Sequence, residues 1–163
     1  MMILRSADRA DVALLGRMLR QSSIDQGGEH LLCANAENLL HEGFVLDPPR
    51  FRCLVAECEG EAAGLALYFP VYSTWVSRTA LYLEDLYVAP EFRRRGVARM
   101  LMRELARTAQ STDCGFIRWL VLRENTRAIR FYESLQAENG GSDSMLIEGE
   151  ALAALAAGTG TIQ

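Results

Sequence analysis

The feature that most constrains this chain is a strand, a basic loop and a helix that follow one another within residues 81–109. Leu81–Val88 is rich in apolar and aromatic residues and is followed by Ala89-Pro90, which predicts a strand that ends there. From Gly96 onward, apolar residues recur every four positions and predict an amphipathic helix: Val97, Leu101, Leu105 and Ala109. Strand, loop and helix of this kind indicate an α/β protein.

The loop between this strand and helix carries three arginines and a glycine, Arg93 to Gly96. The first N–H groups of a helix have no intrahelical acceptor, and the helix dipole adds positive charge at that end. Gly96 lets a ligand approach the backbone, so the corner favours binding of a phosphate group. The alternative is a solvated run of charges ahead of an ordinary helix.

The distribution of charge supports a polyanionic ligand. All 17 basic residues are arginine, and ten of them lie between Arg93 and Arg130 with only three acids. That segment therefore carries +7, while the rest of the chain carries −11. Planar guanidinium groups suit phosphate, and the acidic remainder suits a cationic second ligand. The alternative is codon bias toward arginine with charges scattered over the surface, which explains the absence of lysine more easily than it explains this segregation.

Several classes of protein are disfavoured by the sequence. No apolar run reaches 18 residues and the N-terminus lacks the layout of a signal peptide, so we expect no membrane span and a cytoplasmic location. The four cysteines, Cys33, Cys53, Cys58 and Cys114, lack metal-ligand spacing, so we expect buried thiols and no metal. The arginine cluster lacks interleaved aromatic residues, which disfavours nucleic acid.

Hydrophobic periodicity and turn residues predict the remaining elements within one domain, 1–163. Asp8 is expected to cap the first helix, and Gln21–His30 and Tyr72–Arg78 are expected to be loops. Predicted strands are Met2–Arg5, Phe51–Cys58, Ala63–Val71, Phe116–Leu122 and Ser144–Glu148. Further predicted helices are Asn35–His41, Thr126–Leu135 and Glu150–Ala157. The fold class is mixed α/β with helices covering a central sheet.

Two motifs resemble those of the Gcn5-related N-acetyltransferase (GNAT) superfamily. Arg93, Gly96 and Ala98 fill its acyl-CoA signature [Q/R]-x-x-G-x-[G/A]. Downstream, Asn125, Ala128 and Phe131-Tyr132-Glu133 match its N-x-x-A-x-x-F-Y-E block in the expected order. The resemblance implies a mostly antiparallel sheet, bulged and splayed in its middle, with acetyl-CoA as co-substrate. It implies cofactor contacts at Leu86, Tyr87, Val88, Arg93, Arg94, Arg95, Gly96, Val97, Ala98, Arg99, Asn125, Thr126, Arg127 and Ala128.

Acetyl transfer to an amine needs a base for the amine and a proton donor for the departing thiolate. An alkylamine with a pKa near ~10.4 is only roughly 0.04% neutral at pH 7. We expect Glu84 to be the base, acting through water, although it could instead be a charge partner of the substrate or a solvent-facing residue. Taken by itself, Tyr132 is more often a packed aromatic residue, but within the F-Y-E motif it matches the family's general acid.

Four further stretches are similar to the diamine (spermidine/spermine) N-acetyltransferases: residues 39–44, 51–57, 66–75 and 81–88. This resemblance implies a primary amine as acceptor and a homodimer. It implies substrate contacts at Asp25, Gln26, Trp75, Glu84, Asp85, Arg118, Trp119 and Leu120. Two acids of the family's pocket are replaced, at Gln26 and Ser73, and the glycine after the F-Y-E helix is Gln136.

Because pocket acids are lost, a short diamine or a lysine-like amine is favoured over a long polyamine. Two other functions stay open. One is a GNAT enzyme acting on an amino acid, an antibiotic or a protein N-terminus. The other is an acyl-CoA-binding module without catalysis.

Overall fold

The computed structural model describes residues 1–28, 35–141, 144–145 and 147–157. Its internal contacts divide the chain into two compact units, Met1–Leu120 and Val121–Gln163, and each unit is described by itself. A single domain over 1–163 stays a prediction. No described helix is long and apolar enough to cross a membrane.

The first unit is built on a five-stranded sheet in the order β1-β2-β3-β4-β5. Its strands are β1 (Met2–Ser6), β2 (Arg52–Cys58), β3 (Glu61–Ser73), β4 (Arg78–Val88) and β5 (Ile117–Arg118). The first four pair antiparallel, and β5 joins β4 in parallel at only two positions, Leu81↔Ile117 and Tyr82↔Arg118. The mixed, mostly antiparallel sheet is therefore confirmed, and its pairing on the β5 side of β4 stops at Tyr82.

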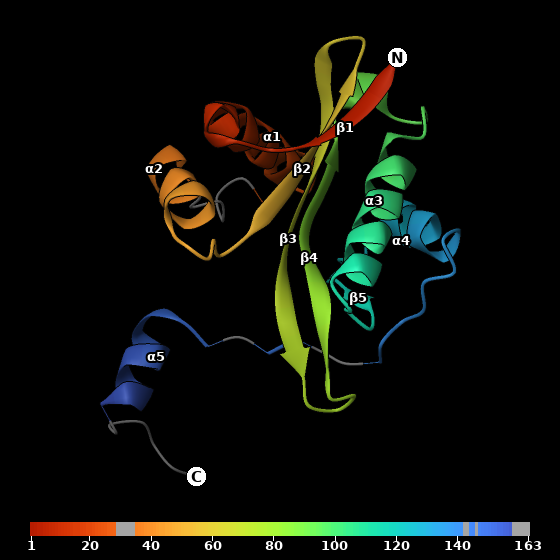
Figure 1. Cartoon of the computed structure of the whole chain (residues 1–163). Helices are drawn as coiled ribbons and strands as arrows, with labels where there is room; N and C mark the ends of the chain where they lie inside the picture. Colours follow the sequence, from red (N-terminus) through yellow and green to blue (C-terminus); the bar gives the residue numbers. More distant parts are fainter. Residues whose placement is uncertain (29–34, 142–143, 146, 158–163) are drawn as a thin grey trace. The chain divides into compact units, whose positions relative to one another are not determined.

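Helices cover both faces of this sheet (Figure 1). The elements α1 (Val12–Asp25) and α2 (Ala36–Leu40) lie on one side and α3 (Val97–Ser111) on the other. A π-helical turn, η3 (His41–Val45), extends α2, while two short 3-10 turns, η1 (Arg9–Asp11) and η4 (Pro90–Phe92), precede α1 and α3. The predicted stripe of α3 is buried, with Val97 2% exposed and Leu101 and Leu105 fully covered.

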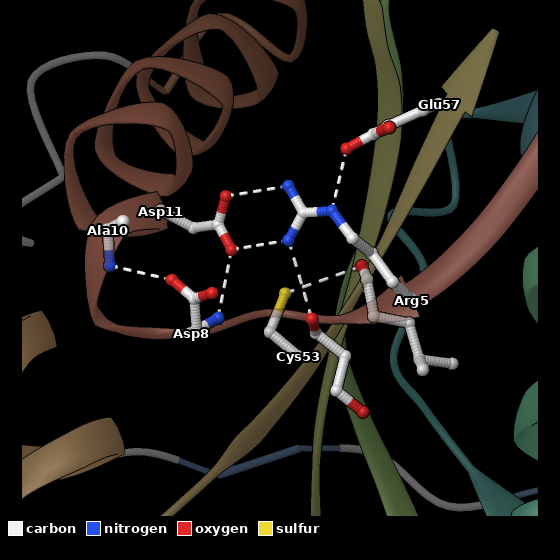
Figure 2. Close-up of polar contacts among 8 residues, drawn as sticks. Arg5, Asp8, Ala10, Asp11, Cys53 and Glu57 are labelled. Atoms are coloured by element: carbon white, nitrogen blue, oxygen red, sulfur yellow. Dashed lines mark hydrogen bonds and ion pairs between the residues drawn. The ribbon is translucent and has the colours of Figure 1, made fainter. Parts of the chain in front are cut away.

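A charged network fastens the start of α1 to the sheet (Figure 2). Arg5 on β1 donates two hydrogen bonds to the Asp11 carboxylate, at 2.6 and 2.8 Å, and one to Glu57 on β2 at 2.6 Å. Asp11 also accepts from the backbone N–H of Asp8, whose own side chain caps the N–H of Ala10. Asp11 is only 7% exposed, and the Arg5 guanidinium lowers the pKa of its carboxyl. Asp8 is thus an N-cap, as predicted, but it caps the 3-10 turn η1 that leads into α1; Asp11, the N-cap residue of α1, makes no capping bond through its side chain.

Several predicted boundaries were wrong. The loop expected over Tyr72–Arg78 is shorter, because Tyr72 and Ser73 belong to β3 and Arg78 begins β4. Gln21–Asp25 is helical rather than looped, because the Gln21 amide bonds the Asp25 carboxylate one turn later, at 2.9 Å, and Ser22 is buried. The strand predicted over Phe116–Leu122 is confined to Ile117–Arg118, because only these two residues pair with residues of β4. Of Ser144–Glu148, the described residues form no strand, and residue 146, like Cys33 and 29–34, lies outside the described residues.

The second unit contains α4 (Thr126–Glu133) and α5 (Gly149–Ala156). Asn125 caps α4 by accepting the N–H of Ala128 at 3.1 Å. The predicted inward residues of this helix, Ala128, Ile129 and Tyr132, are half-buried rather than fully covered. The helix expected near the C-terminus is confirmed.

Candidate active site

The glycine loop and the start of α3 form a backbone-lined corner. Gly96 takes a left-handed φ of 85°, and a Cβ placed there meets no atom within 4 Å. Because Gly96 has no side chain, α3 begins without a side-chain cap, and its first turn carries no acid. Val97 is buried, so any contact it makes with a ligand runs through its main chain. The corner therefore suits a phosphate group that takes hydrogen bonds from backbone N–H groups.

The loop arginines differ in what holds them. Arg93 donates to the Val88 carbonyl at 3.0 Å and forms an ion pair with Asp25 at the end of α1. Arg95 instead lies over the buried Phe92 ring, 5.6 Å from its centroid, and Arg94 is exposed with a φ of 61°. Arg93 thus links the end of β4 to α1 and positions the loop.

A β-bulge in β4 places two consecutive carboxylates on one face of the sheet. Leu83 pairs with Tyr68 and Asp85 pairs with Leu67, so Glu84 is an extra residue without a partner in the register. Tyr68 and Leu67 point to opposite faces of β3, and Asp85 shares the face of Leu67. Glu84 lines a cavity together with Leu67 and therefore opens onto that same face. In a regular strand the two neighbouring acids would point apart.

The two carboxylates of the bulge differ in environment. Glu84 is exposed, whereas Asp85 is half-buried. Burial, followed by repulsion from Glu84, raises the pKa of Asp85 from 3.8 to about 6. Asp85 can therefore exchange a proton near neutral pH.

A cavity of about 410 Å³ adjoins Glu84. Its apolar walls come from α2, from the residue just ahead of β2 and from β3: Leu39, Phe51, Leu67 and Phe69. Its polar residues are Asn38, Glu42, Arg50 and Glu84. Phe69 also stacks on Tyr82, with ring centroids 5.2 Å apart. An apolar chain with a cationic end suits such a cavity.

The remaining residues predicted to bind substrate are scattered over the first unit. Asp25 contacts the glycine loop through Arg93, and the Gln26 amide bonds back to Ser22. Trp75 is 97% exposed in the β3–β4 turn and does not line the cavity. Arg118 lies over Phe116 at the end of the sheet, and Leu120 is 64% exposed. Trp119 is half-buried. A substrate role for these residues stays a prediction.

Leu86, Tyr87 and Val88 follow the bulge on β4 and pair with β3 through Ala66, Leu65 and Gly64. Among the described residues, β5 does not pair with this part of β4. The edge of β4 that faces away from β3 is therefore unpaired along this part of the strand, and binding of the pantetheine arm there stays a prediction. The Val88 carbonyl, however, already accepts from Arg93.

In the second unit, the predicted general acid lies on α4. The Tyr132 ring is half-buried and contacts Phe131, with centroids 5.3 Å apart. Burial raises the pKa of its hydroxyl to about 12, so the phenol is protonated at neutral pH. Asn125 is engaged as the helix cap, and Thr126 and Arg127 are exposed in the first turn.

Sequence reasoning missed Glu42, Arg50 and Asn38 as site residues. The only signal was that residues 39–44 resemble a diamine acetyltransferase stretch, which did not say what the stretch does. Among the described residues, no cluster of His, Cys, Asp or Glu is arranged to hold a metal ion. Cys53 and Cys58 are buried free thiols, as predicted, but Cys114 is half-buried.

Comparisons with known proteins agree with this architecture. Residues 18–136 match the model of the acetyltransferase (GNAT) family. The chain is 34% identical over 165 residues to a thialysine N-epsilon-acetyltransferase of Mus musculus, covering 94% of this chain and 96% of that one. It is 28% identical over 138 residues to spermidine/spermine N(1)-acetyltransferase-like protein 1 of Homo sapiens, covering 80% of this chain and 20% of that one.

The fold is also found among solved structures. An integron cassette protein from the mobile metagenome of V. cholerae superposes with a TM-score of 0.77 at 22% identity, covering 95% of this chain and 97% of that one. The glycine corner at the start of α3 and the bulge in β4 are consistent with the match to the acetyltransferase family model. The chain belongs to the GNAT family and is an acetyltransferase that uses acetyl-CoA as its co-substrate.

Proposed function

We propose that this protein transfers the acetyl group of acetyl-CoA to the primary amine of a small cationic substrate by direct attack. The observation that carries the proposal is the β4 bulge, which turns Glu84 and Asp85 toward one face beside an apolar cavity. Two carboxylates attract an ammonium ion, and a carboxylate with a pKa of about 6 can take the proton that the nitrogen loses as it attacks the thioester, when that nitrogen becomes more acidic. The relatives named for thialysine and polyamine acetylation support an acceptor of this class.

In the reaction, the neutral amine attacks the thioester carbonyl, so that a C–N bond forms and the C–S bond breaks. The proton lost from nitrogen passes to the Glu84–Asp85 pair, and the departing thiolate takes a proton or a hydrogen bond from Tyr132. Against a thiol with a pKa near ~8.5, a phenol of pKa about 12 is uphill by about 3.5 pKa units, or roughly 5 kcal/mol. Tyr132 therefore acts first as a hydrogen-bond donor, and complete proton transfer requires its pKa to fall when acetyl-CoA binds.

The glycine corner at Gly96 would hold the pyrophosphate, as the acyl-CoA signature implies. Arg94, Arg95 and Arg99, which are close to Gly96 in sequence, would add positive charge, while Arg93 holds the loop through the Val88 carbonyl and Asp25. Leu86, Tyr87 and Val88 would bind pantetheine through their main chain.

We further propose a cytoplasmic homodimer. The free thiols Cys53, Cys58 and Cys114 and the acetyl-CoA co-substrate suit a reducing compartment. Sedimentation of the purified protein at micromolar concentration tests the dimer, and a monomer at that concentration contradicts it.

The deciding experiment is an acceptor screen with detection of free CoA thiol. The panel contains diamines, polyamines, basic amino acids, thialysine, an aminoglycoside and peptide N-termini. Acetylation of the small diamines or basic amino acids is expected. Turnover confined to the aminoglycoside or the peptides, or acetyl-CoA binding without turnover of any amine, would contradict the proposal.

A further inference from the structure

Gly43 is a glycine in a helical turn whose backbone does not require one. It is the third residue of η3, and its φ lies outside the left-handed region in which glycine is favoured. A glycine inside a helix is destabilising relative to alanine, because it loses more conformational freedom on folding. The use of glycine at this position therefore depends on the space beside its Cα.

The ring of Phe51 fills that space. A Cβ at position 43 would lie 2.5 Å from Cζ and 2.7 Å from Cε2 of Phe51. Carbon atoms in van der Waals contact are about 3.5–4.0 Å apart, so the ring would have to move by about 1 Å. The N–H of Arg50 donates to the carbonyl of Glu42 at 2.8 Å, and the Phe44 ring meets Phe51 edge-on with centroids 6.3 Å apart. Phe51 is thus held directly against the main chain of η3.

Phe51 is also a wall of the cavity that adjoins Glu84. The other walls fall into two groups, one on α2 and η3 and one on the sheet: Asn38, Leu39 and Glu42, and Leu67, Phe69 and Glu84. Because Gly43 belongs to η3, a ring displaced from Gly43 moves toward the sheet and into the cavity. The lining surface is almost wholly apolar, so the room inside the cavity, rather than its charges, decides which acceptor fits.

We propose that Gly43 is a positioning residue that sets, through Phe51, the length of the acceptor amine that the cavity admits. The inference rests on the proposed function, because it requires the carbon chain of the acceptor to lie in this cavity while the amine meets Glu84. Glycine lets the Phe51 ring withdraw against η3 and leaves room for the chain. A larger residue at position 43 pushes the ring inward and shortens the cavity.

Homologous amines measure this room. Primary alkylamines from propylamine to octylamine form one series, and diamines from 1,3-diaminopropane to 1,8-diaminooctane form another. In the series that is turned over, kcat/KM of the wild-type protein is expected to rise by about 3- to 4-fold with each methylene that the cavity covers. It is expected to fall once the chain is longer than the cavity. A flat profile would show that the chain lies elsewhere and would overturn the inference.

Substitutions at the two contacting positions are expected to move the preferred length in opposite directions. Gly43→Ala is expected to shift the optimum by at least one carbon to a shorter amine. It should lower kcat/KM for the longest amine that the wild-type protein favours by about 10-fold, mostly through KM, and change the shortest by less than about 2-fold. Phe51→Leu removes part of the ring and is expected to shift the optimum to a longer amine. Adding Phe51→Leu to Gly43→Ala is expected to restore the long acceptors.

Opposite shifts separate this role from a merely structural one, because a poorly folded variant loses activity toward every chain length alike. Gly16→Ala is the matched control. Gly16 is a glycine of α1 that faces another cavity residue, Leu39, but a Cβ there would lie at an ordinary 3.9 Å. This variant is expected to keep the wild-type length profile, and thermal unfolding verifies that each variant is folded.

The outcomes distinguish the inference from the proposed function. If Gly43→Ala lowers kcat/KM by the same factor at every length, or Phe51→Leu leaves the optimum in place, Gly43 does not set the acceptor length, and the acetyltransferase assignment stands. If Gly43→Ala does not fold, the shift in Phe51→Leu decides by itself. No turnover of any amine would instead overturn the proposed function, and the inference with it.

Discussion

The glycine corner and the acceptor cavity use opposite kinds of chemistry. The corner is contiguous in sequence, basic and backbone-based, since Gly96 and the first turn of α3 present N–H groups that no side chain caps. The cavity is assembled from separate segments and depends on side chains such as Glu84, Glu42 and Arg50. A motif can identify the first kind of site because the ligand contacts the main chain. A site made of side chains, such as the cavity, can change by one substitution at a time while the fold remains the same.

The largest expected effect is at the corner. Gly96→Glu places a carboxylate where phosphate is to bind and forces a side chain onto a left-handed backbone, so acetyl-CoA binding is expected to fall below detection by calorimetry. Gly60→Glu is the matched control, because Gly60 has a φ of 87° and open space in the β2–β3 turn. If the Gly96 variant still bound acetyl-CoA, the nucleotide end of acetyl-CoA would have to bind at a place other than this corner.

The next effect is at the proton donor. Tyr132→Phe removes the hydroxyl but keeps the half-buried ring, so kcat is expected to fall by about 100-fold while the Kd of acetyl-CoA changes little. Tyr72→Phe changes a tyrosine that is 66% exposed and serves as control. Unchanged turnover at saturating substrate would exclude Tyr132 from the mechanism.

A smaller effect separates the two acids of the bulge. If Asp85 accepts the proton, kcat/KM of the wild-type protein is expected to fall as the pH drops below about 6, because the Asp85 carboxylate becomes protonated there. This fall is the acid limb of the pH profile. Asp85→Asn is then expected to remove this limb and lower kcat/KM by about 30-fold at pH 7.5. Glu84→Gln is expected mainly to raise KM for the amine. If only Glu84→Gln removes the limb, Glu84 is the base, as the sequence alone suggested.

The smallest effect is on stability, and it has the opposite sign to the loss of activity. Because folding raises the pKa of Asp85 from 3.8 to about 6, the folded state binds more protons between these pH values, and the unfolding free energy contributed by this group falls as pH rises through them. Asp85→Asn removes that penalty and is expected to stabilise the protein at pH 7.5 by at most about 3 kcal/mol, the limit set by a pKa shift from 3.8 to about 6.

Chemical denaturation of wild type and variant at pH 4 and pH 7.5 measures this gain, which should shrink at the lower pH. Asp113→Asn, at a carboxyl that is 93% exposed, is the control for the change from Asp to Asn. A destabilised Asp85 variant at pH 7.5 would mean that the carboxylate has a stabilising partner.

Much of the fold was predictable, and the errors have local causes. The stripe of α3, the β2–β3 hairpin and the cap at Asp8 follow from periodicity and capping chemistry, and the structure confirms them. The last turn of α1 was mistaken for a loop because Gln21, Ser22 and Asp25 are polar. Their helical state depends on contacts within the helix and on the burial of Ser22.

The sequence by itself determined the family, and it predicted the acetyl-CoA corner and the site acids at positions 84 and 85, since each is carried by residues close together in the chain. Only the tertiary structure decided that these two acids share a face, because the register shift between β3 and β4 is a property of strand pairing. It also decided that Glu42 and Arg50 meet Glu84 around one cavity. Such contacts join residues far apart in sequence, and the packing of α2 and η3 against the sheet creates them.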